Sequence, residues 1–231
     1  MNDTFIYLLL TLPFVAFSIV VYMLRKDLRH LIIKAGIAGG IVGLILEYWY
    51  FQDYWHPPTL FGSAIPSIED FLFGSSATIV AFVFYVFVTK QKLPVRRRST
   101  KTLIIPAAIG FIALILLTNV LGVNSIISTS LIAATVGTYI LIRQPKLIKK
   151  SLISAAGLVG IATATYAVLF LILSPEYLDT YFLLSGHPAN PTLFGFMPLA
   201  ELMWYGAVGA SMGLVYDHLL IQKSGSSKLA P

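Results

Sequence analysis

Two copies of a short motif place a glutamate at matching positions in the two halves of this chain. The pentapeptide Pro-Thr-Leu-Phe-Gly occurs at 58–62 and again at 191–195, each time a few residues after a histidine. Glu69 and Glu201 each lie three residues beyond a later proline, at the start of a long apolar stretch. A carboxyl shielded by lipid can keep its proton near neutral pH and act as a general acid. We therefore predict that Glu69 and Glu201 are catalytic.

Two further acids are candidates for the same site. Asp70 follows Glu69 at a predicted helix start, where a carboxylate also complements the helix dipole without any further role. Glu47 lies within an apolar stretch, and glycines between Gly36 and Gly43 precede it along one helical face. Small residues let another helix approach closely, so Glu47 is expected to point into a bundle. An interhelical hydrogen bond is its alternative role, and we predict that both acids belong to the site.

Aromatic residues crowd the same stretches. Most fit the aromatic belt of a membrane interface, but some ring faces could stabilise a developing cation. Helical spacing puts Phe73 on the face of Glu69 and Tyr205 on the face of Glu201. The predicted substrate-binding set is Trp49, Phe71, Phe73, Trp204 and Tyr205. His56 and His187 recur in the motif but lack nearby partner ligands, so no metal site is predicted.

The elements that must position these residues are membrane helices. The chain is 57% hydrophobic and 11% charged, more apolar than a soluble domain of 231 residues can bury. Its apolar stretches are each near the roughly 20 residues that cross a bilayer as a helix. The predicted spans are Phe5–Leu24, Leu31–Phe51, Phe71–Val88, Leu103–Val120, Ile126–Ile142, Leu152–Leu173 and Pro198–Leu220. With no cysteine, disulfides and thiol chemistry are excluded.

Basic residues set the expected orientation. All 16 Lys and Arg fall at 25–34, 90–101, 143–150 and in the tail at 223 and 228. With seven spans these clusters lie on one side, which predicts an external N-terminus and a cytoplasmic C-terminus in a prokaryotic cell membrane. The net charge of +6 is then an orientation signal that contacts lipid headgroups, and no nucleic-acid partner is predicted.

The motif also predicts the architecture. The fold class is all-α and polytopic, with seven transmembrane helices as two parallel three-helix repeats joined by one connector helix. Gly40–Gly43 matches Gly157–Gly160, an alignment that puts Ala164 at the position of Glu47. The predicted divisions are a first repeat at 1–90, a connector at 91–124, a second repeat at 125–222 and a flexible tail at 223–231.

One segment carries a family resemblance. Ile65–Phe73, in which Pro66 precedes the paired acids and an aromatic-rich helix, resembles the signature of the membrane-integral lycopene cyclases. These comprise the bacterial heterodimeric type, its fused archaeal form and the cyclase portion of fungal bifunctional enzymes. The family is built from a repeated unit of about three membrane helices. A chain with both units fused would have the length and the seven-span pattern of this one.

The resemblance implies a redox-neutral cyclisation. A protonated carboxyl donates to the terminal double bond of a linear polyene, a neighbouring double bond closes a six-membered ring, and a base removes a proton. Glu69 is the leading acid, and Glu201, Glu47 or Asp70 share the acid and base roles. The implied partner is a hydrophobic polyene that enters from the bilayer. With no nucleotide-binding motif in the sequence, no cofactor is expected.

Three other functions stay open at this point. The second motif copy keeps only one acid, Glu201, which leaves a related prenyl or terpenoid cyclase as an alternative. Parallel three-helix repeats with a connector also occur in small-solute transporters, which need a polar cavity near the bilayer midplane. An assembly protein could use the glycine faces for helix contacts. Homo-oligomers are compatible with each of these functions.

Overall fold

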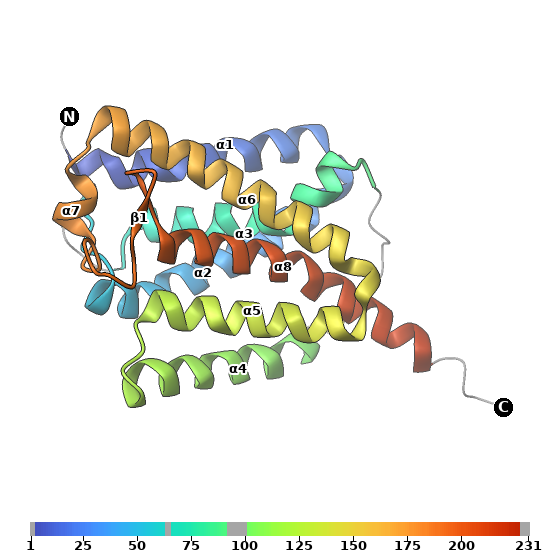
Figure 1. The fold of residues 1–231 in the computed structure, drawn as a ribbon. Coiled ribbons are helices and arrows are strands. Elements are labelled where there is room, and N and C mark those ends of the chain that lie inside the picture. Colours follow the sequence, from blue (N-terminus) through green and yellow to red (C-terminus); the bar gives the residue numbers. More distant parts are fainter. Residues whose placement is uncertain (1–2, 63–65, 92–100, 227–231) are drawn as a thin grey trace.

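The computed structural model describes residues 3–62, 66–91 and 101–226, and most of these residues are helical. Its helices form one bundle, with the N-terminus at one end and the C-terminus at the other (Figure 1). The α-helices are α1 (Ile6–Leu24), α2 (Arg29–Asp53), α3 (Ile68–Val88), α4 (Lys101–Ile115), α5 (Ser125–Arg143), α6 (Ile148–Val168), α7 (Tyr177–Tyr181) and α8 (Leu199–Ser226). Short helical turns are η1 (Asp3–Phe5), η2 (Lys26–Leu28), η3 (Leu116–Val120), η4 (Pro145–Leu147) and η5 (Leu169–Leu173).

Apolar composition and length make several of these helices suited to a bilayer. Five helical segments of the described chain are long and apolar enough to cross a membrane. They are Asp3–Leu24, Lys26–Asp53, Ile68–Val88, Ser125–Arg143 and Pro145–Leu173. Two shorter apolar segments, Ala107–Val120 and Leu199–Val215, accompany them. The long apolar helices indicate a membrane-integral protein, in agreement with the sequence.

Two helices form the centre of the bundle. Helix α3 packs against α1, α2, α6 and α8, while α8 packs against α3, α5 and α6. Helix α4 lies at the edge of the bundle beside α5 (Figure 1). The larger of two hydrophobic clusters among the described residues contains rings from α1, η5 and α8, among them Phe14, Phe170 and Tyr205. Helices α3 and α8 therefore each contact several other helices of the bundle, and both contribute residues to this core.

Glycines bring α2 and α3 into backbone contact. A Cβ atom on Gly43 would lie 2.6 Å from the carbonyl oxygen of Asp70, and one on Gly74 would lie 2.6 Å from that of Gly39. Real Cβ atoms do not come so close, so only glycine permits this crossing. The crossing fixes Glu47, one turn beyond Gly43, against the start of α3.

The two motif loops meet at the end of the bundle that carries the N-terminus, which we call the N-terminal end. Trp55 and Phe182 form an antiparallel bridge, supported by the Leu183 N–H, which donates to the Tyr54 carbonyl at 2.8 Å. The second loop also holds α7 and a two-stranded hairpin, β1 (Thr192–Leu193) with β2 (Met197–Pro198). Asp3 accepts hydrogen bonds from Ser174 at 3.1 Å and Tyr181 at 3.2 Å, which ties η1 to this loop.

Some local features differ from the sequence predictions. Helix α7 and the β1–β2 hairpin were not predicted, because their residues carry no long hydrophobic period. Helix α8 extends to Ser226, into the predicted tail at 223–231, of which 227–231 lie outside the described residues. Most of the basic cluster at 90–101 also lies outside them.

Candidate active site

The four predicted acids are all buried at the N-terminal end of the bundle. Their exposed fractions are 3% for Glu47, 0% for Glu69, 3% for Asp70 and 6% for Glu201. A buried carboxyl needs a hydrogen-bonding partner, and the partners differ from one acid to the next. These differences separate the four acids chemically.

Glu47 and Asp70 form one group. The Trp55 indole N–H donates to the Glu47 carboxyl at 3.1 Å, and the Tyr7 hydroxyl donates to Asp70 Oδ1 at 2.7 Å. The rings of Tyr7 and Trp55 meet edge to face with centroids 4.6 Å apart, which joins the two hydrogen bonds into one layer. Asp70 also caps α3, because its Oδ2 accepts from the Ser67 N–H at 2.6 Å. Asp70 is thus part of the fold as well as of the site.

Glu201 occupies a separate group built from tyrosines. The Tyr54 hydroxyl donates to its Oε1 at 2.7 Å, and the Tyr166 hydroxyl lies near the same carboxyl. The Tyr205 hydroxyl is buried near that of Tyr166 but makes no hydrogen bond of acceptable geometry. Glu201 therefore faces hydroxyls, which can both donate and accept a proton in a hydrogen bond.

Glu69 sits apart from both groups, against the first motif loop. The backbone N–H of Leu60 donates to its Oε1 at 2.7 Å, while its Oε2 is buried without a partner. Tyr177 of α7 approaches from the other loop, and its hydroxyl is also buried without a partner. Burial raises the pKa of Tyr177, with smaller contributions from Tyr181, Asp3 and Glu69, so this phenol stays protonated.

Aromatic rings fill the space between the acid groups. Phe73 stacks on Trp204 with centroids 5.9 Å apart and meets the edge of Tyr205 at 6.3 Å. Phe14 lies nearly parallel to Tyr205 at 5.9 Å and meets Phe73 at 5.7 Å. The structure thus brings together three of the five predicted aromatic residues, Phe73, Trp204 and Tyr205.

The other two predicted aromatic residues lie elsewhere. Trp49 faces α4: its indole N–H donates to Asn119 at 3.0 Å and its ring meets Phe111 at 5.6 Å. The Phe71 ring packs over Gly40 at the crossing of α2 and α3. The motif histidines, His56 and His187, are both exposed.

Sequence reasoning missed the hydroxyls that bind the acids. Tyr7 and Tyr166 sit in apolar stretches like any core aromatic, and Tyr54 falls among belt residues. Tyr54 bonds to a carboxyl 147 positions away, a pairing that no local spacing reveals. A weak indication existed for Tyr7, because a polar ring tip in a fully apolar span needs a buried partner.

The arrangement as a whole is a buried set of carboxyls among phenols, an indole and phenyl rings. It can hold a proton on a buried acid and surround a cation with ring faces. No protein-family model matches this chain, and no curated protein or solved structure matches it either.

Proposed function

We propose that this protein is a membrane cyclase that closes a six-membered end ring on a linear polyene of the lycopene type. The observation that carries the proposal is the environment of Glu201, a buried carboxyl bonded to the Tyr54 hydroxyl beside Tyr166 and Tyr205. The resemblance of Ile65–Phe73 to membrane-integral lycopene cyclases supports the same reaction. Related prenyl or terpenoid substrates require the same chemistry.

Glu201 is the proposed proton donor, in place of Glu69. A backbone N–H can only donate, so the Leu60 N–H bonded to Glu69 Oε1 cannot accept a hydrogen bond from that carboxyl. A phenol can also accept, so Tyr54 can stay bonded to Glu201 whether the acid carries its proton or has given it up. A general acid needs hydrogen-bonding partners both before and after it transfers its proton.

The reaction conserves atoms and electrons. Glu201 donates its proton to one carbon of the terminal double bond, which leaves a tertiary cation on the other. The π electrons of a nearby double bond attack that cation, forming the ring carbon–carbon bond and moving the positive charge into the ring. Loss of a ring proton to a carboxylate then restores a double bond, so the product is an isomer of the substrate.

Glu47 is the proposed base. Its partner, the Trp55 indole, is a donor only, which suits a group that works as a carboxylate. Phe73, Trp204 and Tyr205 are the proposed cation-stabilising rings, because they lie together beside Phe14 between the two acid groups. Asp70 is a positioning residue in this scheme, since it caps α3 and orients Tyr7.

The proposed architecture is seven spans in two parallel repeats, with an external N-terminus and a cytoplasmic C-terminus. Helix packing supports it: α3 packs on α1 and α2, and α8 packs on α5 and α6, as two equivalent three-helix units would. The two shorter apolar segments, Ala107–Val120 and Leu199–Val215, are the proposed fourth and seventh spans. Arg143 and the basic residues of 25–34 and 145–150 support the orientation.

Expression in a bacterium that accumulates lycopene tests this function. Membranes that contain the protein should yield monocyclic or bicyclic products on pigment chromatography, and membranes with the Glu201→Gln variant should not. Unchanged lycopene beside a correctly folded, membrane-inserted protein would reject the substrate. Cyclic product at the wild-type rate from Glu201→Gln would reject the assignment of the acid.

A further inference from the structure

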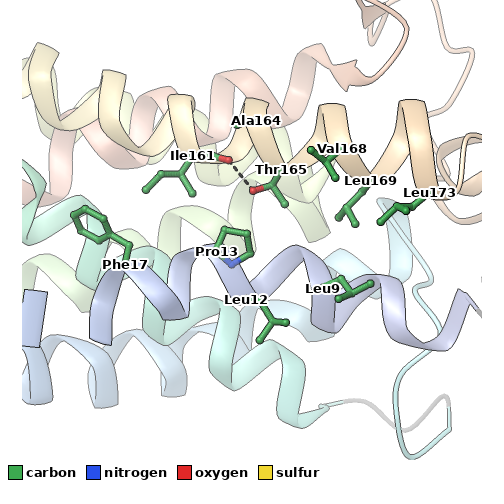
Figure 2. A pocket seen from close by; sticks show the side chains of 10 residues that line it. All are labelled: Leu9, Leu12, Pro13, Phe17, Ile161, Ala164, Thr165, Val168, Leu169 and Leu173. Atoms are coloured by element: carbon green, nitrogen blue, oxygen red, sulfur yellow. Dashed lines mark hydrogen bonds between the residues drawn. The ribbon is translucent and has the colours of Figure 1, made fainter. Parts of the chain in front are cut away.

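A groove of about 670 Å³ runs between α1 and α6, as Figure 2 shows. Its volume is within the roughly 300–1,000 Å³ typical of small-molecule sites. It is lined by Leu9, Leu12, Pro13, Phe17, Ile161, Ala164, Thr165, Val168, Leu169 and Leu173. The one hydroxyl in this lining, on Thr165, already donates to the Ile161 carbonyl at 2.7 Å. The walls thus suit a ligand segment that is pure hydrocarbon, because nine of the ten lining side chains are apolar and the one hydroxyl is already hydrogen-bonded.

Local sequence explains why the groove exists. Pro13 lies inside α1 and has no backbone N–H, so the regular helical bonding is broken at the groove wall. On the opposite wall, α6 has Ala164 where the matching position of α2 has Glu47, so a small side chain replaces a large one. Leu12 and Val168 are 46% and 50% exposed, which leaves the groove open to the side of the bundle that faces lipid.

The groove shares its walls with the candidate active site, although none of the four acids is among its lining residues. Thr165 precedes Tyr166, the residue near the Glu201 carboxyl. Pro13 precedes Phe14, whose ring stacks on Tyr205. Leu169 packs in the same core as these rings. Phe14 and Tyr166, which neighbour the lining residues in sequence, therefore connect the groove walls to the Tyr205 ring and the Glu201 carboxyl.

We infer that this groove binds the linear isoprenoid chain of an uncharged polyene, which enters from the bilayer between α1 and α6 and reaches Glu201 past Phe14 and Tyr166. The inference rests on the proposed function and names the substrate route of that site. The apolar lining matches a ligand with no headgroup. Ordinary phospholipid is the competing occupant, and the experiment separates the two.

The test fills the groove without touching the acids. Ala164 is exposed in the groove, so Ala164→Phe adds a ring there at little cost to folding. Ala38→Phe is the matched control, because Ala38 is an exposed alanine on α2 away from the groove. Each change is made in the Glu201→Gln protein, which should hold substrate without converting it. Lycopene and phospholipid per mole of protein are measured after purification from lycopene-accumulating cells.

The expected result is that the Glu201→Gln protein retains lycopene, that adding Ala164→Phe lowers this at least about tenfold, and that adding Ala38→Phe leaves it unchanged. Absence of lycopene from the Glu201→Gln protein, or equal retention with Ala164→Phe, would overturn the inference. The inference would also be overturned if Ala164→Phe lowered the bound phospholipid and left the bound lycopene unchanged. If the wild-type chain makes no cyclic product but Ala164→Phe still removes bound lycopene, the cyclase proposal fails while the groove assignment stands.

Discussion

Glu69 and Glu201 occupy the same place in a duplicated motif, yet they are held in different ways. Glu69 accepts a hydrogen bond from the Leu60 N–H, and its second oxygen has no partner. Glu201 accepts a hydrogen bond from the Tyr54 hydroxyl and lies near the hydroxyls of further tyrosines. The difference arises outside the motif, because Tyr54 follows α2 and Tyr166 belongs to α6. A repeated sequence therefore repeats the position of an acid without repeating its chemistry.

The most direct test of the different roles of Glu69 and Glu201 is to replace each acid in turn. Glu201→Gln should lower the rate of ring formation at least about 100-fold, the lower end of what a general acid contributes. Glu69→Gln should cost far less, because the amide oxygen still accepts from the Leu60 N–H. Product formation by purified protein in lipid vesicles, with lycopene supplied in the membrane, measures both. A larger loss for Glu69→Gln would reverse the assignment of the two acids.

The same contrast extends to the glycines of the two halves. Gly43→Ala should destabilise the protein by about 1–3 kcal/mol, because its Cβ would meet the Asp70 carbonyl at 2.6 Å. Gly160, its counterpart in α6, has nothing within 4 Å of a Cβ, so Gly160→Ala should be neutral or stabilising by up to about 1 kcal/mol. Thermal unfolding in detergent compares the two variants. Equal melting temperatures would show that the α2–α3 crossing is looser than described.

Removing one hydroxyl sharpens the comparison further. Tyr54→Phe keeps the ring against Phe182 but takes away the partner of Glu201. Turnover should fall about tenfold, since a lost hydrogen bond to a buried carboxyl costs about 1–2 kcal/mol. The measurement is the rate at saturating lycopene, with circular dichroism as the check on folding. An unchanged rate would mean that Tyr166 alone supports the acid.

The smallest effect is expected away from both acids. Trp49→Phe removes the hydrogen bond to Asn119 on the α4 side of α2. Turnover should stay within about twofold, as for most changes outside a site. The companion variant Trp204→Leu, in the ring cluster beside Phe73, should lower the rate clearly more. If Trp49→Phe were as damaging, the original prediction that Trp49 binds substrate would regain support.

Sequence alone predicted the long apolar helices and the burial of the four acids, because apolar length and the cost of a lipid-exposed charge are local properties. It also grouped Phe73 with Tyr205. It could not find the partners of the acids, since Tyr7 reaches Asp70 and Tyr54 reaches Glu201 only after the bundle has assembled. Trp49 and Phe71 were predicted from their depth along a helix, which does not determine the neighbour that the ring contacts. In the structure they pack against α4 and against Gly40.

The contact of Gly43 and Gly74 has a mechanical consequence. Two backbones in direct contact cannot slide or separate without losing this packing, so we expect α2 and α3 to move together. In the proposed substrate route, the motion that admits a bulky ligand is therefore assigned to the boundary between α1 and α6, around Pro13. The proposed entrance is thus the boundary between α1 and α6, and the glycine contact of α2 with α3 stays closed.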